Sequence, residues 1–208
     1  MSAAYDTYRI NIRRAQNFIV LYNSATENRG PGRRDTLTTD ILRAGVVFLH
    51  STLEDYLRSI ILSKKIAMLN TTEADFKAVL ANVNLVGENT GKSSGKKYTL
   101  AEFWDVKDKP VIVVVEEALR DKVSYMTFND YSQIVASLSA VGINLTANFN
   151  SDGIIDNYIK RRHKIVHEAD NNSAHGPGNY KATSINANTL TAWINAVDAL
   201  VGDIEGQL

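Results

Sequence analysis

The sequence predicts an all-α protein in which several helices pack around one long central helix. Apolar residues recur at spacings of three and four along most of the chain, and clusters of glycine, asparagine and serine separate these periodic segments. No second strand-like segment is present to pair with the one ambiguous apolar run. At 208 residues the chain is long enough to bury one sizeable core. We therefore expect a single domain over residues 1–208, with loops near 28–35, 87–98 and 171–184.

The first two predicted helices cover the N-terminal third of the chain. Over 5–27, aromatic and aliphatic residues describe one helical face, namely Tyr5, Tyr8, Ile12, Ala15, Ile19 and Tyr22. The polar stretch 28–35 ends this helix, and a second, longer pattern runs from 36 to about 69. Its middle, residues 44–49, is apolar on all sides, which is typical of a helix buried at the centre of a bundle.

Shorter helices are predicted in the middle of the chain. Either threonine of the pair at 71–72 can cap a helix that runs to about residue 83, and the capping box at 99–102 starts another. Pro110 suits the first turn of a further helix, although the apolar residues 111–115 suit a strand equally well. Helix is favoured because good helix formers continue the segment.

Three more helices are predicted towards the C-terminus. The segment 129–142 begins with an asparagine–aspartate pair that can cap a helix and ends at a glycine that can close it. Ser151 or Asp152 can open the next helix, which ends near residue 170. Residues 187–205 make a final amphipathic helix.

Composition and charge exclude several classes of function. The chain contains no cysteine, which excludes a disulfide scaffold, cysteine-type metal centres and a thiol nucleophile, and fits a reducing compartment. The N-terminus is too polar for a secretory leader, and no apolar run approaches the ~20 residues that span a bilayer. We expect a soluble, cytoplasmic protein that does not bind membranes. The 23 basic and 23 acidic residues argue against a general nucleic-acid binder but allow a local basic patch.

The predicted helix over residues 154–169 carries the most informative pattern. Placed at 100° per residue, its apolar residues fill an arc of about 140°, and Arg162 lies in the middle of that arc. The arc consists of Ile154, Ile155, Tyr158, Ile159, Ile165, Val166 and Ala169. An unpaired charge facing a core or an interface costs several kcal/mol, so Arg162 needs a carboxylate or an anionic ligand as its partner.

The remaining residues of this helix allow more than one interpretation. His163, His167 and Asp156 cluster just past the edge of the arc, and the rest of the circumference holds Lys160, Arg161, Lys164 and Glu168. A structural interpretation is that the basic residues favour the negative end of the helix and that Arg162 forms an ion pair. In a metal-site interpretation, the two histidines four residues apart share one ion. No HExxH glutamate or third ligand accompanies them, so we predict no metal site.

Two segments resemble a known family. Residues 162–167, RHKIVH, resemble the signature of the HEPN superfamily, which is an arginine, a polar residue directly after it and a histidine a few residues later. The surrounding RRHKIVHEAD is similar to the terminal motif of the RiboL-PSP type. Residues 45–58, with an apolar run followed by a glutamate and an arginine, look like the long helix of the family.

The resemblance implies a homodimeric helical bundle whose two motifs meet in one cleft and, in active members, cleavage of RNA without a metal or other cofactor. Arg162 and His167 are then the expected catalytic residues. His163 and Glu54 are expected to support them, and possible contacts to the RNA backbone come from Lys160, Arg161 and Lys164. Such an enzyme acts as a toxin or a defence effector and has a cognate antitoxin or inhibitor. The alternative is a HEPN module that binds RNA, a nucleotide or a protein without cleaving.

Helix geometry constrains how the motif can work. Arg162 and His167 are five residues apart, which separates them by about 140° around a regular helix. Either the helix distorts after Val166, or the cleft is composite and the two residues reach the scissile phosphate from opposite walls. We expect the second arrangement, in a two-fold dimer with this helix at or beside the axis.

Overall fold

The structure is a computed structural model that describes residues 2–27, 35–69, 71–72, 74, 77, 108–172 and 181–208. The described helices are α1 (Ala3–Thr26), α2 (Thr36–Leu69), α5 (Val111–Ser124), α6 (Tyr131–Ser139), the 3-10 turn η1 (Ser151–Gly153), α7 (Ile154–Glu168) and α8 (Ala187–Gly206). Two short strands, β1 (Asn171–Asn172) and β2 (Lys181–Ala182), pair in antiparallel register. The predicted all-α class is confirmed.

The chain divides into two compact units. The first contains residues 1–57 and 128–208, and the second contains residues 58–127. Helix α2, the longest described helix, contributes its first part to the first unit and its last part to the second. A single domain over 1–208 stays a prediction.

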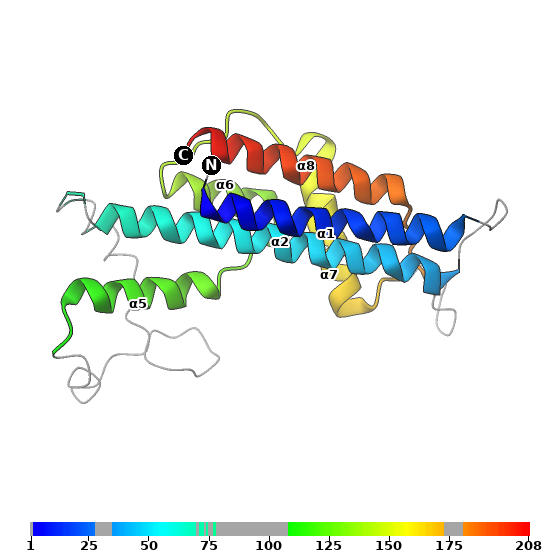
Figure 1. Ribbon diagram of the computed structural model, residues 1–208, viewed down its shortest axis with the longest axis horizontal. Coiled ribbons are helices and arrows are strands. Elements are labelled where there is room, and N and C mark those ends of the chain that lie inside the picture. The colour runs from blue at the N-terminus through cyan, green and yellow to red at the C-terminus, as the bar shows by residue number, and fades with distance from the viewer. Residues whose placement is uncertain are drawn as a thin grey trace. The chain divides into compact units, whose positions relative to one another are not determined.

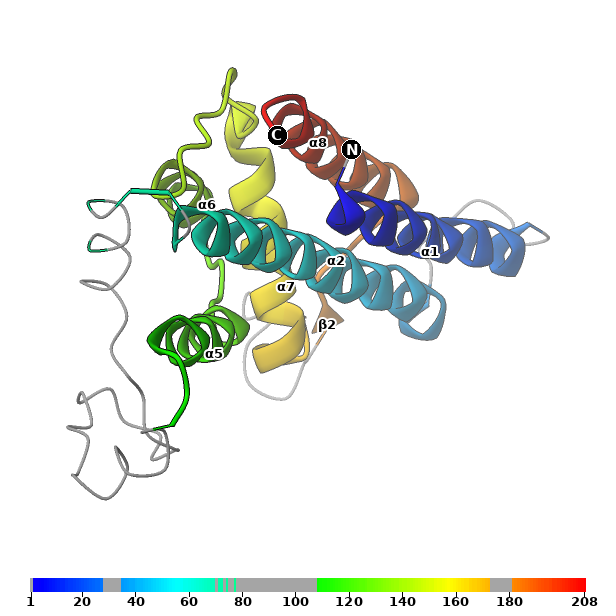
Figure 2. The same ribbon diagram turned by 60° about the vertical axis from the view of Figure 1, so that its left-hand side comes forward.

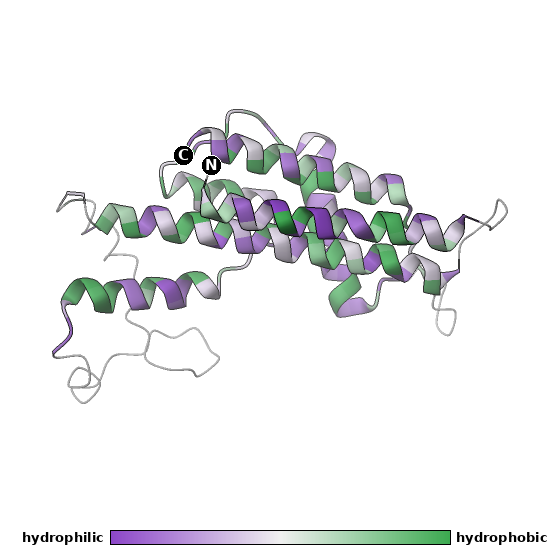
Figure 3. Ribbon diagram, viewed as in Figure 1, coloured by the Kyte–Doolittle hydropathy of each residue, from purple (hydrophilic) through white to green (hydrophobic). Residues whose placement is uncertain are grey.

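The first unit is a helical bundle. Helix α8 packs along α1 and also contacts α7, which runs across the other helices (Figures 1 and 2). Gly45 on α2 permits a close approach, because a Cβ atom there would lie 2.7 Å from Cδ2 of Leu190 and 3.0 Å from Cβ of Phe18. The core is formed by fully buried side chains from all four long helices, among them Tyr8, Ile12, Leu49, Leu53, Tyr56, Tyr158 and Leu200. Hydrophobic and hydrophilic residues share these helices in Figure 3, as expected for helices with one buried face.

The second unit is built around α5. Leu69 from the end of α2 packs with Val115 and Leu119 of α5, and the partly buried Leu62, Met68 and Ile112 cover this cluster. The choice of helix over strand for residues 111–115 is therefore correct. Pro110 precedes the first helical residue and its carbonyl accepts the amides of Val113 at 3.0 Å and Val114 at 3.3 Å.

The helix boundaries agree with the sequence in most places and differ at the start of α7. The side chain of Asp130 accepts the amide of Gln133 at 2.8 Å and caps α6 as predicted. Neither Ser151 nor Asp152 caps α7. Instead the side chain of Asn150 accepts the amides of Ile155 and Asp156 at 2.9 and 3.0 Å. The 3-10 turn η1 lies between Asn150 and the first residue of α7. Its backbone, with φ of 55° at Asp152, brings Asn150 into capping position.

Several predicted features lie outside the described residues or differ in detail. The helix expected over 71–83, the loop at 87–98 and the capping box at 99–102 lie largely or wholly outside the described residues. The loop expected near 171–184 contains the β1–β2 pair at its ends. Among the described helices none is long and apolar enough to cross a bilayer.

Candidate active site

Helix α7 carries the motif in one uninterrupted helix. It continues regularly through Val166 to Glu168 and ends where Ala169 and Asp170 adopt left-handed φ values of 49° and 57°. The amide of Asp170 turns back to the carbonyl of Lys164 at 3.0 Å. The alternative of a helix that distorts after Val166 is therefore wrong. Arg162 and His167 stay about 140° apart around α7.

Arg162 is half-buried in the first unit. Its Nε is buried and has no hydrogen-bond partner among the residues that the structure describes. The neighbouring Tyr158 is fully buried, and its hydroxyl also lacks a partner there. Burial raises the pKa of the Tyr158 hydroxyl well above its usual range, with a further rise from the charge of Glu54 and an opposing effect from Arg162. The tyrosine therefore remains protonated and lies within the electrostatic reach of both charges.

Glu54 and His50 lie on α2 beside this tyrosine. Oε1 of Glu54 accepts the amide of Phe128 at 3.3 Å and lies 3.2 Å from Nε2 of His50. Both residues are buried, and the ring of His50 is 5.8 Å from that of Tyr158. We call His50, Glu54, Tyr158 and Arg162 the buried polar cluster. Glu54, expected to support Arg162 or His167, lies on the Arg162 side of α7.

His163 and His167 lie together on the exposed part of α7. Both side chains are exposed, and their ring centroids are 4.4 Å apart with an angle of 42° between the planes. The rings are accessible from solvent, so either imidazole can exchange a proton with a bound molecule. Within the described ranges, no group of three or more histidine, aspartate or glutamate side chains could hold a metal ion.

Arg161 has a different environment from the one that the helical wheel predicts. It was expected on the solvent-facing polar side, but only 14% of its side chain is exposed. Its NH2 nitrogen donates to Oδ2 of Asp170 at 2.7 Å and to the carbonyls of Thr183 at 2.8 Å and Ser184 at 3.2 Å. The reversed backbone after Glu168 places Asp170 and the residues following β2 over this side of the helix.

Asp170 binds a second arginine from the start of α2. Nε of Arg43 donates to the same Oδ2 atom at 2.6 Å, and its NH2 nitrogen donates to the carbonyl of Thr183 at 2.7 Å. The Asp170 side chain is completely buried. Burial lowers the pKa of the Arg161 guanidinium, Asp170 opposes this shift and Arg43 adds to it. Sequence reasoning missed this network, because Arg43 and Asp170 are 127 positions apart and no pattern connects them.

The two lysines expected at the RNA backbone frame a pocket. Lys160 is exposed and Lys164 half-buried, and both line a hollow beside Arg161. The structure thus brings three groups together on α7: the buried polar cluster, the exposed histidine pair and a lysine-lined pocket. It does not bring Arg162 and His167 to one face.

A helical bundle with an arginine and histidine motif on α7, a helix that packs against α8, is the arrangement expected of the HEPN class. A family model described as RiboL-PSP-HEPN matches residues 10–208, and the chain belongs to this family. No curated protein and no solved structure matches the chain.

Proposed function

We propose that the chain is a metal-independent endoribonuclease that cleaves RNA by transesterification at a composite site in a homodimer. The observation that carries the proposal is the environment of Arg162. Nε is buried without a hydrogen-bond partner in both Arg161 and Arg162, but the terminal NH2 nitrogen of Arg161 donates to Asp170, whereas no hydrogen bond of the Arg162 guanidinium is found among the described residues. A buried donor without a partner costs about 1 to 3 kcal/mol, and a phosphoryl oxygen of the substrate would satisfy it.

The chemistry matches the residue types. A base removes the proton of the ribose 2′-hydroxyl, and its oxygen attacks the adjacent phosphorus. The bond to the 5′-oxygen then breaks, and an acid returns a proton to that leaving oxygen. The products are a 2′,3′-cyclic phosphate and a 5′-hydroxyl. Histidine is the residue type that most often serves as general acid or base, the role proposed for His167, and Arg162 has a planar fork of donors for the charged phosphoryl oxygens.

A dimer would supply what one protomer lacks. Each protomer contributes one His167, and a two-fold axis would present two of them, one as base and one as acid. The regular α7 keeps Arg162 and His167 of one chain on different faces, which favours opposite walls of a shared cleft. Val166, adjacent to His167, leaves 48% of its surface exposed although it belongs to the predicted apolar arc. We propose that this uncovered end of the arc contributes to the dimer interface.

The proposal also includes a cellular role as a toxin or defence effector with a cognate inhibitor. A nuclease that cuts cellular RNA stops growth when it is produced without its inhibitor. Induction of the wild-type chain should therefore arrest growth of a bacterial host, and induction of His167→Ala to the same protein level should not.

The direct test is incubation of the purified protein with a mixed RNA pool in EDTA, followed by analysis of the new ends. We expect cleavage with 2′,3′-cyclic phosphate and 5′-hydroxyl ends and a loss of about 10²- to 10⁴-fold for His167→Ala. Glu168→Ala, next to the histidine and exposed, is the matched control and should keep its activity. Strict dependence on added metal, or wild-type cleavage by His167→Ala, would refute the mechanism.

A further inference from the structure

We propose that the pocket lined by Lys160 and Lys164 binds one nucleotide of the RNA strand next to the scissile phosphate. The inference rests on the proposed function and adds a substrate subsite to it. The pocket has a volume of about 330 Å³ and is formed entirely within the first unit. This volume is at the small end of the range for ligand pockets, which suits a single nucleotide unit rather than a longer segment.

The walls of the pocket combine apolar and polar groups in the manner of a nucleotide site. Ile185 and Trp193, which are 7% and 8% exposed, form its apolar part. The side chains of Asn157, Ser184 and Thr189 add amide and hydroxyl groups around it. An aromatic ring with neighbouring hydrogen-bonding groups can accept any base, because every base has a π-face and polar edges.

The charge of the pocket favours a phosphate. Lys160, Arg161 and Lys164 are its charged lining residues. The charge of Arg161 is balanced by Asp170, whereas within the described parts of the chain neither lysine forms an ion pair. Two ammonium groups one helical turn apart at the edge of a pocket can neutralise phosphates of a single strand.

The pocket is held open by contacts that need no ligand. Arg161 donates to the carbonyls of Thr183 and Ser184, two residues of the pocket wall, and Asp170 fixes Arg161 from the other side. The buried network of the two arginines and Asp170 therefore supports the pocket wall. A preformed wall loses less conformational freedom when a ligand binds.

The position of the pocket relates it to the catalytic motif. Lys164 and His167 are three residues apart on the regular helix α7, which separates them by about 4.5 Å along the axis and about 60° around it. Arg162 lies on the far side of α7 from the lysines. A nucleotide in the pocket would thus be next to the imidazole that exchanges protons, on the same protomer.

The test uses Trp193 as a reporter and an RNA that cannot be cleaved. The chain has two tryptophans, so Trp104→Phe leaves Trp193 as the only indole. A short, single-stranded 2′-O-methyl oligonucleotide lacks the attacking hydroxyl, so its binding does not depend on nuclease activity. We expect this RNA to change the Trp193 emission, a nucleoside monophosphate to change it at higher concentration, and the nucleoside without phosphate to have little effect.

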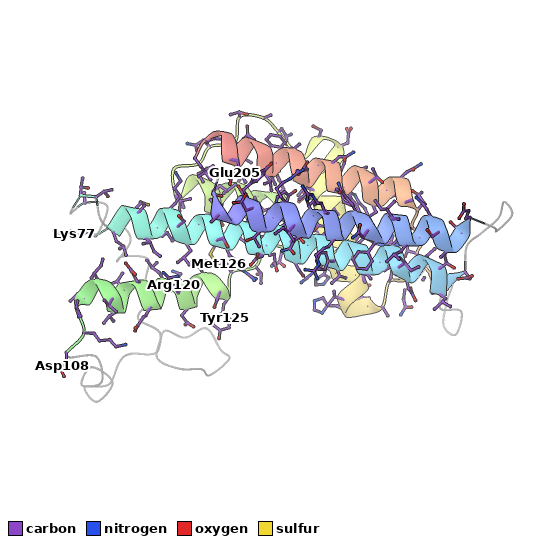
Figure 4. The ribbon with its side chains drawn as sticks, viewed as in Figure 1. Lys77, Asp108, Arg120, Tyr125, Met126 and Glu205 are labelled. Carbon is purple, nitrogen blue, oxygen red and sulfur yellow. The ribbon has the colours of Figure 1, made fainter. Side chains whose placement is uncertain are left out.

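Substitution of the two lysines is the second part of the test. In the same background, Lys160→Gln with Lys164→Gln should weaken RNA binding by about tenfold near 0.1 M salt and reduce the slope of log K against log salt by about 1.4. The control, Arg13→Gln with Arg120→Gln, removes the same charge at exposed positions on α1 and α5 and should bind as the parent does. Arg120 is labelled on α5 in Figure 4.

Three results would overturn the inference. They are an unchanged Trp193 emission at saturating RNA, equal binding by the lysine variant and the control, and an equal response to poly-glutamate, which would assign the pocket to an acidic protein segment. Failure of the nuclease proposal gives a different pattern. A protein that shows the Trp193 response but never cuts natural RNA would keep the pocket and lose the catalytic assignment.

Discussion

Arg161 and Arg162 are neighbours on α7, and their surroundings differ. Arg161 donates to a buried carboxylate and two backbone carbonyls, although the helical wheel places it on the polar side. Arg162 lies in the middle of the apolar arc, and its Nε is buried without a hydrogen-bond partner among the described residues. Among the described residues, the ion pair that the structural interpretation assigns to Arg162 is found at Arg161.

The difference separates a stabilising charge from one that is positioned for a ligand. A buried pair contributes to stability only when its partners satisfy each other, and removal of one partner leaves a costly buried charge. In the region of Asp170, Arg43 and Arg161, both guanidinium groups donate to Oδ2 of the carboxylate, and only Nε of Arg161 and Oδ1 of Asp170 are buried without a partner among the described residues. Around Arg162, no hydrogen bond or ion pair of the guanidinium is found among the described residues, and the Tyr158 hydroxyl and Nδ1 of His50 are also buried there without a partner. Residues there should matter less for folding and more for activity.

The largest expected effect on stability is that of Asp170→Asn. This variant keeps the shape of the side chain but leaves Arg43 and Arg161 without their shared carboxylate, at a cost of about 3 to 5 kcal/mol in the free energy of unfolding. Urea unfolding followed by circular dichroism measures it. Glu117→Gln is the control, because Glu117 pairs with Lys109 at an exposed site and such pairs contribute about 1 kcal/mol or less. A loss for Asp170→Asn no larger than for the control would remove the stabilising role.

The same substitution should reduce stability much more at Arg161 than at Arg162. Arg161→Met leaves the Thr183 carbonyl with Arg43 alone and removes one donor from Asp170, so we expect a loss of about 1.5 to 3 kcal/mol. Arg162→Met replaces a buried polar atom that has no described partner and should change stability by less than about 1 kcal/mol. Thermal unfolding of both variants beside the parent gives the comparison. Equal losses would contradict it.

Two buried tyrosines, Tyr8 and Tyr158, allow the same comparison of a paired and an unpaired buried group, with a smaller expected effect. The Tyr8 hydroxyl donates to Asp198 at 3.1 Å, whereas the Tyr158 hydroxyl has no hydrogen-bond partner in the described structure. Tyr8→Phe should cost about 1 kcal/mol, and Tyr158→Phe should leave the unfolding free energy unchanged or raise it by about 1 kcal/mol. If calorimetry shows that Tyr158→Phe is the more destabilising change, the Tyr158 hydroxyl has a partner in solution.

The smallest expected effect is at Glu205 on α8 (Figure 4), whose carboxylate accepts hydrogen bonds from the amide and hydroxyl of Ser2. Burial raises the pKa of Glu205, but hydrogen bonds from Ser2 and Tyr56 outweigh it and lower the pKa below its usual value. The folded state then binds the proton more weakly than the unfolded state, so this stabilisation is present at neutral pH and is lost as the pH falls below about 4.3. We expect Glu205→Gln to lose about 0.5 to 1 kcal/mol at pH 7 and less as the pH falls below about 4.3, as measured by urea unfolding. A loss that does not depend on pH would contradict this assignment.

Local periodicity was sufficient to predict the fold class and most helices. The boundaries of α2 and α8 agree with their patterns to within a residue or two, because both helices bury one continuous apolar stripe. The predicted cap of α7 was wrong, because a 3-10 turn allows Asn150 to cap the helix in place of Ser151 or Asp152. Val166 was expected to be covered and is exposed, because the apolar arc does not reveal where the neighbouring helices end.

The candidate site was predictable only in part. The inward direction of Arg162 and the pairing of His163 with His167 follow from 100° per residue, and the structure has both. The Asp170 network depends on a reversed backbone at Ala169 and on a residue of α2, and neither leaves a periodic signal. The pocket of Lys160 and Lys164 depends on the residues after β2. Contacts between distant segments, rather than helix propensity, determine these features.

The most direct test of the account is the rate of RNA cleavage in EDTA by Arg162→Met and Arg161→Met, measured at a temperature where both remain folded. The account predicts that Arg162→Met lowers the rate by about 10²- to 10³-fold, as expected when a donor to the developing charge is removed. Arg161→Met should keep a rate within about tenfold of the parent, because it acts through the pocket wall and not on the scissile phosphate. Wild-type cleavage by Arg162→Met would contradict the catalytic role of Arg162 and leave its position on α7 a matter of structure alone.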